Sequence, residues 1–203
     1  MALDSLQDLY VEQLRDLYSA EQQILDALPK MIDASTHPQL KQGFELHQRQ
    51  TEEQVRRLEQ IFRDLGERPG GEKCDGMEGL LKEGKKMMKE RGDDNVRDAG
   101  IIASAQRVEH YEIAGYGSAR NFALGLGRER DAQLLQQTLD EEGETDHKLT
   151  QIAESVVNPD AGARRADREV ARGTSREAGM AGERASGTRR DIDTGRSDLG
   201  TTR

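Results

Sequence analysis

The sequence has little of the material from which β-sheets, disulfide frameworks and zinc-thiolate sites are built. Its 203 residues include no Trp, three Phe and four Tyr, so aromatic residues make up 3% of the chain. Because strands are rich in aromatic and β-branched residues, this scarcity argues against a β-sandwich or a β-barrel. The single cysteine, Cys74, excludes a disulfide within one chain and a zinc site made of cysteines.

Long apolar segments are missing as well. No stretch approaches the roughly 18 apolar residues of a membrane-spanning helix. Residues 1–9 have neither the basic start nor the apolar run of a signal peptide. We therefore expect a soluble protein of the reducing cytoplasm that does not bind membranes.

Charge is abundant and unevenly distributed. Charged residues make up 34% of the chain, and the formal net charge is −9. Residues 158–203 hold 10 Arg and 8 acidic side chains, whereas the residues before them hold 20 basic and 31 acidic side chains. An acidic body repels nucleic acids and anionic lipids but suits metal cations. We therefore expect no nucleic-acid binding by the body.

Composition divides the chain after residue 157. From Asn158 and Pro159 onward the sequence is dominated by Gly, Ala, Arg, Ser, Thr and Asp, with few large apolar residues. Such a segment buries too little surface to offset the entropy lost on folding. We expect one folded domain over residues 1–157 and a disordered tail over residues 158–203.

Apolar residues in the first part recur every three or four positions, which is the period of one helix face. The pattern predicts four long amphipathic helices, with stripes over residues 3–31, 40–65, 95–122 and 135–156, and a short one near residues 77–88. The first and last pairs have short links, whereas about 30 residues separate Gly66 from Val96. These lengths predict an all-α, ferritin-like four-helix bundle of two antiparallel hairpins joined by a long crossover, which carries the short helix.

Polar side chains interrupt each of the four apolar stripes near its middle. Counted from the turns at the two ends of the bundle, Glu21 lies at the height of Thr51. The same count pairs Glu112 with Glu142, so the interruptions meet in one layer of the core. Buried carboxylates without a counter-charge cost several kcal/mol each, and bound cations would remove this cost. Carboxylates with one imidazole and no thiolate favour iron or manganese.

Other candidates near this layer have simpler interpretations. Glu144 and His147 form the one literal Glu-x-x-His match to dinuclear carboxylate bundles, but the helical period turns Glu144 toward solvent. Tyr116, one turn beyond Glu112, is expected to be a core tyrosine, with donation to a ligand carboxylate as the alternative. His110 is expected at the surface or beside a ligand.

Several segments together are typical of one known family: residues 17–23 (LYSAEQQ), 77–80 (MEGL), 96–99 (VRDA) and above all 107–114 (RVEHYEIA). They resemble the corresponding segments of the YciF/YciE-type ferritin-like stress proteins. The resemblance covers about the first 157 residues. It implies a ferritin-like bundle, usually a homodimer, with a dinuclear metal centre and a role under osmotic or oxidative stress.

The resemblance also implies a set of metal ligands. The residues that match the family's polar layer are Glu21, His47, Glu109, Glu112, Glu142 and Asp146. Where the family commonly has Glu shortly before Thr51, this chain has Arg49 and Gln50. We expect Gln50 at the edge of the inner face, where its neutral oxygen binds metal more weakly than a carboxylate.

Two functions are compatible with these observations. The first is a metal-binding stress protein that holds one or two iron or manganese ions in the bundle core and, if it is redox active, reduces peroxide or dioxygen. The second is a non-enzymatic, dimeric helical stress protein whose polar layer is vestigial and which acts through protein contacts. The metal content of the purified protein distinguishes them.

Overall fold

The computed structural model describes residues 3–163, which contain five α-helices, one π-helical segment and no strand. The elements are α1 (Leu6–Ala34), α2 (Pro38–Leu65), α3 (Asp75–Met87), α4 (Asp94–Gly125), α5 (Glu129–Ile152) and the π-helical η1 (Ala153–Val157). The predicted all-α class is confirmed, and so are the four long helices and the short one.

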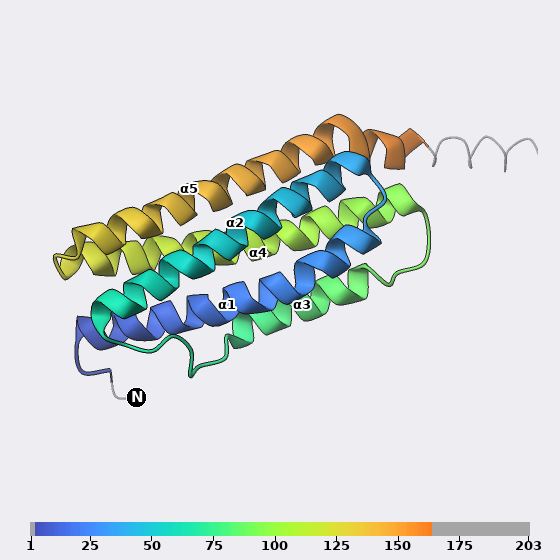
Figure 1. The fold of residues 1–203 in the computed structure, drawn as a ribbon. Helices are drawn as coiled ribbons and strands as arrows, with labels where there is room; N and C mark the ends of the chain where they lie inside the picture. The colour runs from blue at the N-terminus through green and yellow to red at the C-terminus, as the bar shows by residue number, and fades with distance from the viewer. Residues whose placement is uncertain (1–2, 164–203) are drawn as a thin grey trace, which may run out of the picture. The chain divides into compact units, whose positions relative to one another are not determined.

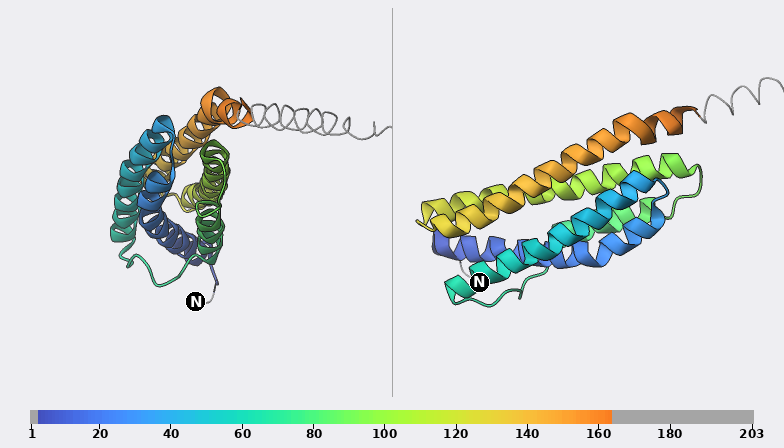
Figure 2. Two further views of the ribbon diagram at one scale, coloured as in Figure 1. Left: turned by 90° about the vertical axis from the view of Figure 1, so that its right-hand side faces the viewer. Right: turned by 45° about the horizontal axis from the view of Figure 1, so that its top comes forward.

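The long helices form two hairpins that pack side by side (Figure 1). Residues 35–37 join α1 to α2, and residues 126–128 join α4 to α5. Between the hairpins, α1 packs on α4 and α2 packs on α5. The crossover over residues 66–93 runs back along the bundle and carries α3, so α2 and α4 point the same way (Figure 2). The predicted connection of the two hairpins is confirmed.

The helix ends follow from local sequence. Ser5 caps α1 by accepting a hydrogen bond from the Asp8 backbone N–H at 3.1 Å. Pro38 begins α2, where its missing N–H costs nothing. Gly66 ends α2 with φ of 71°, a left-handed conformation that glycine adopts without strain.

Asp98 fastens the α1–α2 turn to α4. Its carboxylate is fully buried and accepts hydrogen bonds from the backbone N–H groups of Thr36 and His37 at 2.8 to 3.1 Å. The Thr36 hydroxyl donates a further bond at 2.8 Å. Charge-assisted bonds of this kind are about twice as strong as neutral ones, so this contact fixes the end of the bundle.

The crossover helix α3 lies on the outside of the bundle, against α1 and α4 (Figure 1). Met77 and Cys74 are its fully buried anchors. The Tyr111 hydroxyl donates to the Asp16 carboxylate at 2.8 Å, so the Cys74 thiol donates to the Tyr111 oxygen at 2.9 Å. Burial raises the pKa of this thiol, which is consistent with its role as a donor.

The last described residues continue the helical conformation of α5 and η1. Val157 is buried in the core, and helical conformation continues over residues 158–163 despite Pro159. The rest of the predicted tail lies outside the described residues. None of the helices described is both long enough and apolar enough to cross a membrane.

The buried apolar residues fall into two clusters that are separated along every long helix. One cluster includes Ile24, Phe44 and Ile101, and the other includes Leu14 and Leu58. Between them lies a set of buried polar side chains contributed by α1, α2, α4 and α5. This polar layer is the candidate functional site.

Candidate metal centre

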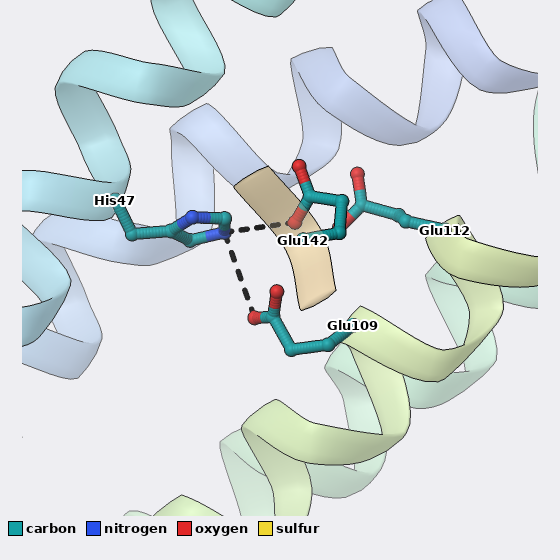
Figure 3. Close-up of side chains that lie close together, drawn as sticks. All are labelled: His47, Glu109, Glu112 and Glu142. Atoms are coloured by element: carbon teal, nitrogen blue, oxygen red, sulfur yellow. Dashed lines mark ion pairs between the residues drawn. The ribbon is translucent and has the colours of Figure 1, made fainter. Parts of the chain in front are cut away.

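Three helices bring four polar side chains to one point in the core (Figure 3). His47 comes from α2, Glu109 and Glu112 come from consecutive turns of α4, and Glu142 comes from α5. One ligand atom from each of the four lies within 4.8 Å of those of the others. We call this group the four-residue cluster.

The cluster is sealed from water. All four residues are at most 2% exposed. His47 Nε2 lies 3.5 Å from Glu109 Oε1 and 3.9 Å from Glu142 Oε2, and Figure 3 shows the imidazole directed at both carboxylates. These separations are long for direct hydrogen bonds, so the ring and the carboxylates surround a point without closing on each other.

Several atoms of the layer lack a hydrogen-bond partner among the described residues. These atoms are His47 Nε2, Glu21 Oε2, Gln54 Oε1, Glu109 Oε2, Glu142 Oε2 and both oxygens of Glu112. A buried polar atom without a partner costs about 1–3 kcal/mol, and more if it is charged. Native proteins keep few such atoms, so a concentration of them at one point indicates an absent partner.

Burial and mutual repulsion disfavour ionisation of the carboxyls. Burial is the main cause that raises the pKa of Glu109 and of Glu112 well above the ordinary value. The charge of Glu142 raises the pKa of Glu109 further, and the charge of Glu21 raises that of Glu112. Without a cation these two carboxyls therefore hold their protons to a higher pH than usual, and a bound metal ion would displace them.

Glu21 approaches the cluster from α1. It is fully buried, and burial together with the charge of Glu142 raises its pKa well above the ordinary value. The Tyr116 hydroxyl donates a hydrogen bond to Glu21 Oε1 and leaves Oε2 free. Tyr116 is thus both a core tyrosine and a donor to a candidate ligand. The sequence had suggested these two roles as alternatives.

Gln54 also belongs to the polar layer, although it is not among the six metal ligands expected from the sequence. It is fully buried on α2, and its amide Nε2 donates to Glu142 Oε1 and, at 3.1 Å, to Glu141 Oε2. Arg57 holds Glu141 through two bonds of 2.6 and 2.7 Å. The signal in the sequence was the position of Gln54 on the α2 stripe, seven residues after His47.

The structure does not bring Asp146 into the four-residue cluster. Asp146 is half-buried one turn beyond Glu142, where it accepts a bond from Gln106 Nε2 at 3.0 Å. His110 Nε2 lies 3.4 Å from the same carboxylate, and its side chain is 67% exposed. His110 therefore lies at the surface, as expected, and contacts a candidate ligand.

The outer face of α5 carries the other residues weighed from the sequence. Glu144 is exposed, as the helical period predicted, and His147 is exposed as well. Gln50 lines a shallow groove with both of them. Gln50 is half-buried, as expected for the edge of the inner face of α2, and it lies outside the four-residue cluster.

The donor set fits one or two first-row metal ions. Carboxylate and imidazole bonds to such ions are about 2.0–2.2 Å long, so donors on opposite sides of an ion stand about 4 Å apart. The four-residue cluster is close to this size. Two divalent ions would also balance the four ionised carboxylates of Glu21, Glu109, Glu112 and Glu142. Oxygen and imidazole donors without thiolate suit iron and manganese.

Two antiparallel hairpins with a long crossover, and a carboxylate layer at mid-height, define a ferritin-like helical protein. Residues 5–162 match the family described as a domain of unknown function, DUF892, and the chain belongs to this family. It is 40% identical over 162 residues to the protein YciF of Escherichia coli strain K12, a match that covers 79% of this chain and 98% of YciF.

Solved structures of similar proteins agree with this assignment. The crystal structure of the E. coli stress protein YciF has a TM-score of 0.74 and covers 76% of this chain and 98% of its own. YcfI, a putative structural protein from Rhodopseudomonas palustris, is 43% identical, with a TM-score of 0.72 over 74% of this chain and 96% of its own.

The fold alone extends to a more distant protein. A dodecameric thioferritin, the bacterioferritin-related protein of Bacteroides fragilis, is 14% identical, with a TM-score of 0.60 over 78% of this chain and 91% of its own. The predicted ferritin-like fold and the predicted family are both confirmed.

Proposed function

We propose that the chain is a stress-response protein that binds one or two iron or manganese ions in the core of its bundle. The observation that carries this proposal is the group of buried donor atoms without partners in the polar layer. Other buried polar groups of the fold, such as Asp98, are fully hydrogen-bonded. A layer built only for stability would be satisfied in the same way.

The four-residue cluster would hold the first ion. His47 supplies the imidazole, and Glu109, Glu112 and Glu142 supply carboxylates. Glu21 Oε2 and Gln54 Oε1 are the further donors available to a second ion. Asp146 is assigned to a supporting position, because its carboxylate is engaged by Gln106 and lies beside His110.

Two ferrous ions held in this layer would supply two electrons, which with two protons reduce peroxide to two waters or dioxygen to peroxide, leaving ferric iron. In the metal-free layer burial raises the pKa of Glu109 and of Glu112, so these ligands would release protons when the ions bind. Tyr116 orients Glu21 through its hydroxyl, and the apolar clusters on both sides keep bulk water out.

Metal titration tests this proposal. The protein is purified without chelators, its metal content is measured, and its melting temperature is recorded with added Fe(II), Mn(II) and Zn(II). A bound ion should raise the melting temperature of the parent by mass action. It should not do so for Glu112→Ala or Glu142→Ala, which lack one ligand.

The matched control is Glu144→Ala, because Glu144 lies on the same helix as Glu142 but is exposed. This variant should respond to metal as the parent does. If none of the three ions changes the melting temperature of the parent, the metal proposal fails. The alternative of a vestigial layer and a function through protein contacts would then hold.

A cytoplasmic homodimer completes the proposal. The dimer is what the family resemblance implies, and the buried thiol of Cys74, the single cysteine of the chain, suits a reducing compartment. Light scattering of the purified chain measures the oligomeric state directly.

A further inference from the structure

Three cavities lie on the α3 side of the bundle. A surface groove of about 330 Å³ between α1 and α3 is rimmed by charged residues that include Lys30 and Lys82. A cavity of about 20 Å³ is lined by residues of α1, α3 and α4. A third, of about 10 Å³, is bounded by His47 and Glu109 of the four-residue cluster.

Each cavity shares lining residues with the next one. Ala27, Leu81 and Met88 line both the groove and the second cavity. Met31, Leu81 and Val108 line both the second and the third. The three cavities are therefore adjacent and form a path in series from the surface to the cluster, with Met31, Leu81 and Met88 between them. Methionine side chains are flexible enough to move aside. We call this path the α3 channel.

The inner part of the channel is small and apolar. A cavity needs roughly 10–15 Å³ to admit one water-sized molecule, so each inner cavity holds about one. Ser104 is a polar residue on the wall, and its hydroxyl already donates to the Gly100 carbonyl at 2.9 Å. A solute that crosses this part of the channel finds few hydrogen-bond partners.

An apolar lining favours the passage of small molecules that lose little hydration free energy on leaving water. Removing one polar group from water without a new partner costs at least about 1–3 kcal/mol, and an ion costs far more. Hydrogen peroxide carries two hydroxyl groups and would bear this cost, as would superoxide or a hydrated cation. Dioxygen has no hydrogen bonds to lose, so this cost does not apply to it.

We propose that the α3 channel admits dioxygen to the four-residue cluster, so that dioxygen is the small-molecule substrate of the metal site. The inference rests on the metal-binding function proposed above, but the channel is a property of the chain itself. It gives the crossover helix a role beyond connecting the two hairpins.

Nuclear magnetic resonance of the metal-free full-length chain tests the channel directly. Methyl groups are observed while the pressure of dissolved dioxygen, which is paramagnetic, is raised. Val108 and Leu28 line the third cavity, whereas Leu58 and Leu14 are buried in the other apolar cluster. The methyl signals of Val108 and Leu28 should shift and broaden more. Equal or smaller effects at Val108 and Leu28 would overturn the proposal.

A variant that narrows the entrance of the α3 channel gives a second test. Ala27→Leu places bulk where the groove meets the second cavity, and should reduce the dioxygen effect at Val108 and Leu28. Ala114→Leu makes the same change at an exposed position of α4 and should leave it unaltered. Unchanged effects in Ala27→Leu would contradict the channel.

The iron-loaded protein separates the channel from the metal site. There Ala27→Leu should slow oxidation by dioxygen without changing iron affinity, and equal oxidation rates in this variant and the parent would contradict the channel. Failure of the parent to bind metal would instead refute the metal site. The dioxygen effects on the methyl signals of the metal-free chain would still test the channel.

Discussion

The Tyr116 hydroxyl donates a hydrogen bond to Glu21, the carboxyl that α1 contributes to the polar layer. In Tyr116→Phe the buried Glu21 Oε1 loses its donor, and an unsatisfied buried acceptor costs about 1–3 kcal/mol. We expect the free energy of unfolding of the metal-free protein to fall by about this amount in a urea titration. Tyr18→Phe is the matched control, since its hydroxyl makes only a long contact with Glu59 at 3.4 Å, and it should change stability by at most about 0.5 kcal/mol.

Gln54 offers a way to strengthen the metal site. In Gln54→Glu a fifth carboxylate enters the layer beside Glu142. Metal affinity should rise, because a cation binds an ionised carboxylate better than an amide oxygen, while the metal-free protein should lose stability through repulsion. Competition with a coloured chelator measures the affinity. Gln137→Glu adds the same charge at an exposed site of α5 and should leave the affinity unchanged.

Helix periodicity predicted which residues of the layer face the core. Glu21, Glu112 and Glu142 interrupt apolar stripes at one height, and the structure brings them together. Asp146 follows Glu142 by four residues and shares its stripe, but the height along a helix decides whether a side chain reaches the cluster. Gln54 went unassigned because sequence alone does not distinguish a buried amide in a ligand layer from an amide in an apolar stripe.

At the level of the elements, the attachment of α3 depends on close contact at its first turn. A Cβ atom at Gly76 would stand 2.8 Å from Cε2 of the Tyr111 ring, and Tyr111 also bonds Cys74 and Asp16. Gly76→Ala should therefore displace the ring and lower the free energy of unfolding by about 1–3 kcal/mol. Thermal or urea unfolding measures the change.

Gly79, one turn further along α3, is the matched control. A Cβ atom there meets nothing within 4 Å, so Gly79→Ala should raise stability by about 0.5–1 kcal/mol through helix propensity alone. Equal responses at the two positions would show that the Tyr111 contact does not hold α3 in place.

Sequence periodicity located the elements because each long helix buries one face along its whole length. Gly66 and Pro38 marked helix ends correctly, since a left-handed residue and a missing N–H are local constraints. Pro159 does not end the helical conformation, which continues to residue 163. The π-helical turn before it, closed by a bond from the Asn158 N–H to the Ala153 carbonyl, carries the chain past that position.

Across the whole molecule, the acidic layer sets how stability varies with pH. In the unfolded chain the carboxyls of Glu21, Glu109 and Glu112 lose their protons near the ordinary pKa of 4.5, whereas burial raises the pKa of each in the folded protein. Above pH 4.5 the unfolded state therefore binds fewer protons, and the free energy of unfolding falls as pH rises. The metal-free protein should melt at a lower temperature at about pH 8 than at about pH 5.

Bound metal should reverse this trend, since a cation favours the ionised carboxylates and competes with protons for them. The melting temperature of the metal-loaded protein should consequently rise over the same pH range, and the gap between the two forms should widen. Glu112→Gln removes one titrating group of the layer, so its metal-free form should show a shallower slope than the parent. Scanning calorimetry at a series of pH values measures all three slopes, and a metal-free parent that gains stability as pH rises would show that the layer is not protonated in the folded state.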